Sequence, residues 1–237
     1  MAYNFPMSLP KQKHLRLAEL MAAFSLAMDL GLGQPMEWVM RTCLPGVHLS
    51  DLLGLNQEEQ RQVYYLSLLR HIGCTATADW EAAVFGNELA LGDALITDAK
   101  HPAEALRFLL NAPGRGQPLL SRVRHLGKAL AAGPGMKGAV DRIQCEVAGQ
   151  LAQRLDFDKD LRQALGQVFE RWDGQGEPHQ LKGENLALSV RIVHLAQDAV
   201  TVQIMSGLKT AVANLSPREI EVLLTENRAF TRCVSFA

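Results

Sequence analysis

The stretch NQEEQRQVYYLSLLRHIG at residues 56–73 decides the fold class. Asn56 and Glu59 have the spacing of a capping box, in which each side chain accepts a hydrogen bond from the other residue's backbone amide at the start of a helix. Apolar residues then recur at helical spacing and form one stripe that ends at Gly73, made of Val63, Leu66, Leu69 and Ile72. The pattern predicts a helix with one buried face.

The same helical period returns along most of the chain. It predicts further helices over residues 11–30, 102–110, 119–132, 140–155 and 158–172. Residues 190–205 are rich in valine and isoleucine, which favours a strand, but their length and charges favour a helix, and no other strand would pair with them. Pro45 removes a backbone amide from the helix after Pro35, so we expect a kink or a break there. The sequence therefore predicts an all-α fold.

Composition narrows the class of protein further. The chain has 237 residues, 48% of them hydrophobic and 21% charged, which is the balance of a globular domain. Its 24 Lys and Arg against 25 Asp and Glu offer no excess of positive charge for a nucleic-acid backbone. Four widely spaced cysteines indicate buried reduced thiols and a cytoplasmic protein, and no apolar run is long enough to cross a membrane.

Several segments, taken together, resemble a known superfamily. Leu68–Gly73 is similar to the Leu-Leu-His-Asp-Ile-Gly helix end of the HD superfamily of metal-dependent phosphohydrolases. The segment FERWDGQGEP at 169–178 resembles His-His-Glu-x-x-Asp-Gly-x-Gly-Tyr-Pro of the HD-GYP branch, and Met36–Arg41 resembles its opening His-x-x-Arg helix. Leu30–Glu37 and Val63–Leu66 look like the N-terminal domain of LuxR-type bacterial regulators. The resemblance implies an HD-like helical bundle.

The resemblance also implies a metal centre, since HD-GYP enzymes hydrolyse cyclic di-GMP with two or three iron or manganese ions. The corresponding ligand positions hold different residues here, namely Trp38, Arg70, His71, Cys145, Val168, Phe169 and Gln197, with Asp198 offset by one residue. We call these eight residues the ligand positions. Tryptophan, valine and phenylalanine offer no lone pair to a metal, and Arg70 brings a cation. We therefore expect no metal and no cofactor; a weak site from His71, Cys145 and Asp198 is the alternative.

The residues of the turn that follows Phe169 match the family pattern. They are Glu170, Asp173, Gly174, Gly176, Pro178 and Gly183, and glycine and proline at such points serve turn geometry. The match predicts that the fold is retained, with Arg70 pairing to Glu170 inside it.

These observations lead to a non-catalytic regulatory or interaction domain in bacterial signalling. It would bind a small molecule or nucleotide, or act through a homodimer or a partner protein. Two alternatives stay open: a metal-dependent cyclic di-GMP phosphodiesterase with an unorthodox site, and a fragment of a LuxR-type transcriptional regulator. DNA binding by this chain alone is not expected.

The expected domain plan has three parts. Residues 1–14 form an irregular lead-in, residues 15–207 form the HD-GYP-like domain, and residues 208–237 form a helical extension. Leu215–Leu224 in that extension resembles the first helix of a LuxR-type helix-turn-helix. A basic stretch is predicted to be either a solvated helix face or a nucleotide surface, and it contains Arg115, Arg122, Arg124, His125 and Lys128.

Overall fold

The computed structural model describes residues 16–86, 97, 101–133 and 135–206. Within these ranges the chain is helical, and the one extended pairing is an isolated bridge between Asp173 and Lys182, so the all-α prediction is confirmed. The predicted lead-in and C-terminal extension, including Leu215–Leu224, lie outside the described residues. The α-helices are α1 (Leu17–Gly31), α2 (Trp38–Leu52), α3 (Gln57–Leu69), α4 (Ala78–Phe85), α6 (Pro102–Asn111), α7 (Leu119–Ala132), α8 (Met136–Arg154), α9 (Lys159–Leu165) and α10 (Leu188–Ser206), with 3-10 turns η1 (Ile72–Ala76) and η2 (Gly183–Asn185).

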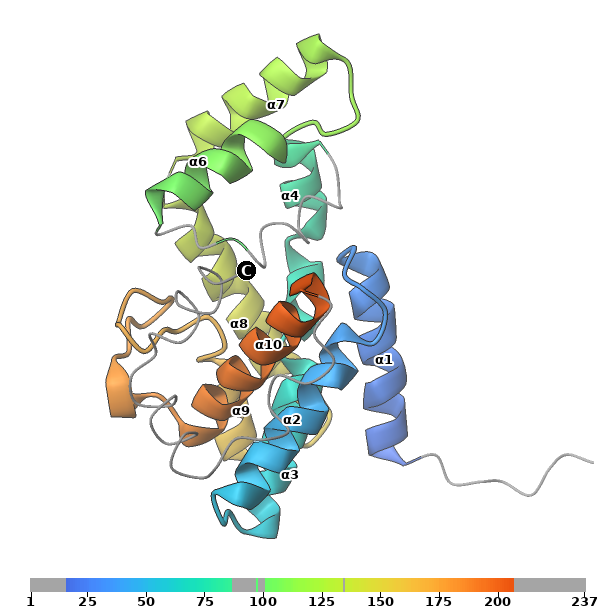
Figure 1. Ribbon diagram of the computed structural model, residues 1–237, viewed down its shortest axis with the longest axis vertical. Helices are drawn as coiled ribbons and strands as arrows, with labels where there is room; N and C mark the ends of the chain where they lie inside the picture. The colour runs from blue at the N-terminus through green and yellow to red at the C-terminus, as the bar shows by residue number, and fades with distance from the viewer. Residues whose placement is uncertain (1–15, 87–96, 98–100, 134, 207–237) are drawn as a thin grey trace, which may run out of the picture.

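Six of these helices form the main bundle, which is α1, α2, α3, α8, α9 and α10 (Figure 1). The predicted stripe on α3 lies in its core, where Val63 and Leu66 are fully buried. Asn56 caps α3 as expected: its side chain accepts from the amides of Glu58 and Glu59, and the Glu59 carboxylate accepts from the Asn56 amide at 2.9 Å. The local signal and the burial therefore agree on this helix.

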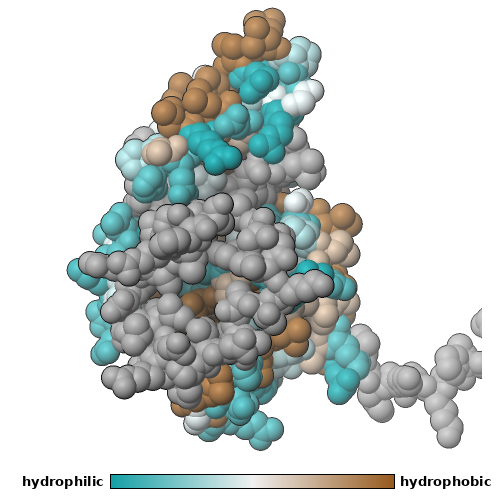
Figure 2. Space-filling model, viewed as in Figure 1, coloured by the Kyte–Doolittle hydropathy of each residue, from teal (hydrophilic) through white to brown (hydrophobic). Residues whose placement is uncertain are grey.

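A smaller lobe of α4, α6 and α7 lies at one end of the molecule, and α8 runs from it into the main bundle (Figure 1). The edge-to-face pair of Phe85 and Phe108 lies in its core. Figure 2 shows apolar side chains gathered on the surface at this end, and the exposed ones on α6 and α7 are Leu106, Leu110, Leu119, Leu120, Val123 and Leu130.

The predicted basic stretch lies on α7 and in the loop before it. Lys128 donates to the carbonyl of Ala83 at 2.7 Å, and Arg122 donates to that of Leu110 at 3.2 Å. The His125 ring lies 2.9 Å from the carbonyl oxygen of Val84. Three of its five side chains thus join α7 to α4 and α6 by hydrogen bonds to the backbone.

Two helix boundaries differ from the expected ones. Helix α2 continues through Pro45, so of the expected kink or break the break does not occur. Gly46, the next residue, packs closely against Val63 of α3. Helix α9 ends at Leu165 rather than near 172, because the chain then enters the turn segment 166–187. The ambiguous stretch from 190 is a helix, as predicted.

Helix α8 and η1 lie backbone against backbone. A Cβ on Gly73 would overlap the carbonyl oxygen of Gln144, so only glycine allows this approach. The Gln144 side chain adds hydrogen bonds to the same contact between α8 and η1. Its Oε1 accepts from the Cys74 thiol at 3.4 Å, and its Nε2 donates to Thr77 Oγ1 at 2.7 Å. Cys43, Cys74 and Cys145 are free and buried, which confirms the prediction for these three.

Candidate functional site

The ligand positions come together where α3 ends against α10 and the 167–170 segment. Arg70 is the C-cap of α3 and is 8% exposed, and His71 follows it into the interior. Trp38 at the start of α2 lies on the His71 ring, with ring centroids 5.4 Å apart and planes 16° from parallel. Trp38 and His71 are therefore neighbours in the fold, as are Arg70 and Val168.

Arg70 is a buried cation with most of its hydrogen-bonding capacity unused. Its Nη2 donates a long bond of 3.5 Å to the carbonyl of Val168, while Nε and Nη1 have no partner among the residues that the structure describes. Burial lowers the pKa of the guanidinium to about 10, so it still carries its charge at neutral pH. The predicted pair with Glu170 is wrong, because that carboxylate is engaged elsewhere.

Two histidines beside Arg70 are kept neutral. Burial, and then the charge of Arg70, lower the pKa of His194 to about 3 and that of His71 well below its usual range. His194 Nε2 donates to the Val168 carbonyl at 2.9 Å, whereas His71 Nε2 is buried without a partner. His194 is therefore a satisfied interior histidine, as expected from its apolar helix.

Asp198 remains part of this cluster despite its offset of one residue. Burial raises the pKa of its carboxyl to about 7, and the charge of Arg70 is the strongest influence that opposes this rise. The neighbouring Gln197 is buried on the same helix. A carboxyl that titrates near neutral pH next to a buried cation is a frequent feature of functional sites.

The other ligand positions hold packing residues. Trp38, Cys145 and Val168 belong to the main core, with Phe169 packed against it. Burial raises the pKa of the Cys145 thiol to about 12, as is usual for a thiol packed in a core. Within the described ranges, no three His, Cys, Asp or Glu side chains come together in a way that could hold a metal ion. The residues present therefore do not fit the metal ions of the family, and the alternative His71–Cys145–Asp198 site does not form.

The turn segment retains the predicted architecture. Glu170 is 1% exposed, and its carboxylate accepts from the amides of His179 at 2.5 Å and Leu181 at 2.9 Å. Asp173 accepts from the Gln175 amide at 2.9 Å. A Cβ on Gly176 would overlap the backbone of Glu170 and Arg171, which explains the glycine. Carboxylates and glycine here shape the backbone.

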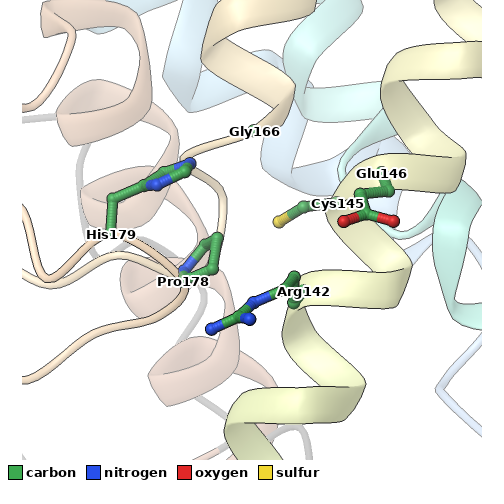
Figure 3. Close-up of a pocket in the computed structure, with 6 residues that line it drawn as sticks. All are labelled: Arg142, Cys145, Glu146, Gly166, Pro178 and His179. Carbon is green, nitrogen blue, oxygen red and sulfur yellow. The ribbon is translucent and has the colours of Figure 1, made fainter.

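A pocket of about 440 Å³ lies between α8 and the turn segment (Figure 3). Figure 3 shows α8 on one side and the turn segment on the other, with the Cys145 sulfur directed between them. The lining residues are Arg142, Cys145, Glu146, Gly166, Pro178 and His179. One ligand position, Cys145, therefore forms part of a cavity.

No pattern in the sequence pointed to the remaining pocket residues. Arg142 and Glu146 are one helical turn apart, so they share a face of α8, but so do many exposed charges. His179 comes from a distant loop and has no metal-ligand spacing. Only the folded backbone brings these side chains together.

Comparison with known proteins agrees with the broad assignment. Residues 144–216 match the family model of the HD domain. The "3'3'-cGAMP-specific phosphodiesterase 3" of Vibrio cholerae is 26% identical over 230 residues, which cover 92% of this chain and 50% of that protein. A crystal structure of a cyclic GMP-AMP specific phosphodiesterase from V. cholerae, V-cGAP3, superposes with a TM-score of 0.55 at 23% identity, over 92% of this chain and 53% of that one. This chain spans about half the length of these relatives.

These findings support an HD-superfamily fold and correct the functional interpretation. The expected non-catalytic domain is wrong, because the relative that covers 92% of the chain is an enzyme, a phosphodiesterase. The alternative of a phosphohydrolase with an unorthodox site fits better. The finer likenesses to the HD-GYP branch and to LuxR-type regulators receive no support from these matches. No helix in the described part of the chain is long and apolar enough to cross a membrane.

Proposed function

We propose that this chain works in the hydrolysis of a cyclic dinucleotide, as part of an HD-type phosphodiesterase. The relative's substrate makes 3',3'-cGAMP the first candidate, and cyclic di-GMP is the second. The observation that carries the proposal is the pocket beside Cys145, which lies between α8 and the turn segment that the HD resemblance identified.

The pocket suits one nucleotide unit of such a substrate. Its volume of about 440 Å³ falls within the range of small-molecule sites. Arg142 supplies a guanidinium that can form two parallel hydrogen bonds to a phosphate. Pro178 and the Cys145 thiol offer a less polar wall for a base. These features favour a ligand that carries both a phosphate and an apolar ring.

The pocket also contains groups that can move protons during hydrolysis. A water oxygen would bond to phosphorus while the bond from phosphorus to a ribose oxygen breaks. Glu146 would take the proton from the water as general base, and His179 would give a proton to the departing ribose oxygen as general acid. The Arg142 guanidinium would stabilise the negative charge that develops on the phosphate oxygens. No step passes through a metal ion, since the ligand positions do not fit one.

Turnover of purified protein tests this proposal. We expect the protein to convert 3',3'-cGAMP or cyclic di-GMP to a linear product, measured by chromatography with EDTA and with added Mn²⁺ or Fe²⁺. Arg142→Gln should lower kcat/KM at least tenfold. The matched control is Arg154→Gln, an exposed arginine at the far end of α8, and it should stay within twofold of the wild type.

Each other outcome has a defined meaning. No turnover of either nucleotide under any of these conditions would overturn the proposed function. If the protein is active and kcat/KM is unchanged in both Arg142→Gln and Arg154→Gln, the assignment of the reaction to this pocket is overturned. The homodimer and partner-protein predictions are separate from both results and stay predictions.

A further inference from the structure

We infer that Arg70 and His71 form a second, buried anion site that binds a phosphoryl group without a metal ion. The inference deepens the proposed function and rests on it only for the natural ligand, since a phosphoryl group of a nucleotide and free inorganic phosphate share the same chemistry. The observations that carry it are the unpartnered atoms at the ligand positions.

Arg70 offers donors that no residue in the described part of the chain uses. Its Nε and Nη1 are buried and have no hydrogen-bond partner, and Nη2 makes one bond of 3.5 Å. Within the described residues the guanidinium has no ion pair closer than 4 Å. A buried cation with unpaired donors is costly, and native structures usually pair such groups. A planar fork of this kind matches two oxygens of a phosphate.

His71 adds a second unpartnered atom beside the guanidinium. The Cys74 thiol donates to Gln144 Oε1, so the contact of 3.8 Å between Cys74 Sγ and His71 Nδ1 places the ring proton on Nδ1. Nε2 then carries a lone pair. It is buried with the Gln197 side chain beside it, and among the described residues it has no hydrogen-bond partner within 3.5 Å. This nitrogen can accept the hydroxyl of a singly protonated phosphate, while stacking on Trp38 holds the ring in place.

The surroundings select a phosphoryl group over a carboxylate or a metal. Glu170 is engaged by two backbone amides and does not neutralise Arg70. Asp198 is the acid that acts on Arg70, and His194 is engaged by the Val168 carbonyl. A singly protonated phosphate satisfies both the two donors of Arg70 and the acceptor of His71, whereas a carboxylate has no hydroxyl for Nε2. A fixed guanidinium thus stands where the family places its metal ions.

Calorimetric titration of the full chain with inorganic phosphate tests this inference. The protein is first dialysed against EDTA, and we expect saturable binding that EDTA does not weaken. Arg70→Met, which keeps the side-chain volume without the charge, should weaken binding at least tenfold. Arg70→Lys, which keeps the charge without the fork, should weaken it less. The control Arg154→Met should bind as the wild type does.

Asp198→Asn sharpens the result, because removing the acid beside Arg70 should tighten phosphate binding several-fold. The inference is overturned if the wild type does not bind phosphate, if binding needs added Mn²⁺ or Fe²⁺, or if Arg70→Met and Arg70→Lys both bind as tightly as the wild type. If Arg70→Met does not fold, Arg70→Lys and Asp198→Asn decide the question. Phosphate binding with no nucleotide hydrolysis would support this site and reject the proposed function, so the two can fail separately.

Discussion

Within the turn segment, residues 170–187 lie beside the ligand positions and differ from them in what their side chains do. In the turn segment, Glu170 and Gly176 hold the backbone by hydrogen bonds and by close approach. At the ligand positions, Trp38 and Val168 fill space and Arg70 carries an unpaired charge. The residues that fix the backbone of the turn are therefore under different physical constraints from the residues at the ligand positions. One set can match a family pattern when the other does not.

The largest effect is expected in the turn segment, from Gly176→Ala. The new Cβ would overlap the backbone of Glu170 and Arg171, which cannot move without dismantling the turn. We expect the free energy of unfolding to fall by about 4 kcal/mol, measured by urea denaturation. The control is Gly149→Ala on α8, where a Cβ meets nothing within 4 Å; it should raise stability by about 1 kcal/mol, because alanine is the better helix former. Equal effects of the two would contradict the role given to Gly176.

A somewhat smaller loss is expected from Glu170→Ala. Two buried amides, those of His179 and Leu181, would lose a charged acceptor. Hydrogen bonds to charged groups contribute more than neutral ones, so unfolding should become about 3 kcal/mol easier. Glu184→Ala is the matched control, since that carboxylate is exposed in the same segment, and it should stay within about 0.5 kcal/mol of the wild type. A stable Glu170→Ala would show that the carboxylate is not what holds this turn.

At the ligand positions, Asp198→Asn should change how stability depends on pH. The folded carboxyl has a pKa of about 7 against an ordinary 3.8, so the folded state binds the extra proton between these values. Asp198 therefore lowers stability progressively as pH rises from about 4 through 7. Relative to the wild type, the variant should gain stability as pH rises from 4 to 7, by at most about 1.4 kcal/mol for each pH unit.

The Asp198 measurement is a difference between two denaturation series, because Asp29, His71 and His194 also titrate in the folded state with shifted pKa values. Subtracting the wild-type curve cancels their contributions. A difference that stays flat from pH 4 to 8 would mean that Asp198 does not lie in the environment described for it.

The smallest effect is expected from Phe169→Leu. Phe169 packs against the core and lies under the Lys137 ammonium, 5.6 Å from the ring centre. An apolar replacement of similar size should cost about 1 kcal/mol in urea denaturation, as is usual for conservative core changes. If Phe169→Leu lowered the free energy of unfolding as much as Glu170→Ala, the contrast between the two regions would not hold.

Much of the fold could be predicted because its signals are local. The capping box of Asn56 and the stripe from Val63 to Ile72 need only neighbours along the chain, and both are confirmed. The continuity of α2 through Pro45 could not be predicted, since it depends on packing between Gly46 and Val63. The early end of α9 depends likewise on the turn segment that follows it.

The site was predicted in part. The family resemblance brought together Arg70, His71 and Val168, which the structure places in contact or as chain neighbours. It also suggested an Arg70–Glu170 pair, which fails because two backbone amides engage the carboxylate. Arg142 and His179 carried no signal, since a cavity between a helix and a remote loop has no sequence period.

The close approach of Gly73 to Gln144 has a mechanical consequence. Helix α8 carries Arg142 and Cys145 at the pocket, and η1 directly follows Arg70 and His71. No side chain separates the backbones of α8 and η1, and the Gln144 side chain is hydrogen-bonded to Cys74 and Thr77. Because closely packed groups deform little, a displacement of α8 would move η1 with it. A ligand that displaced α8 at the pocket would therefore also displace η1 and the residues that precede it.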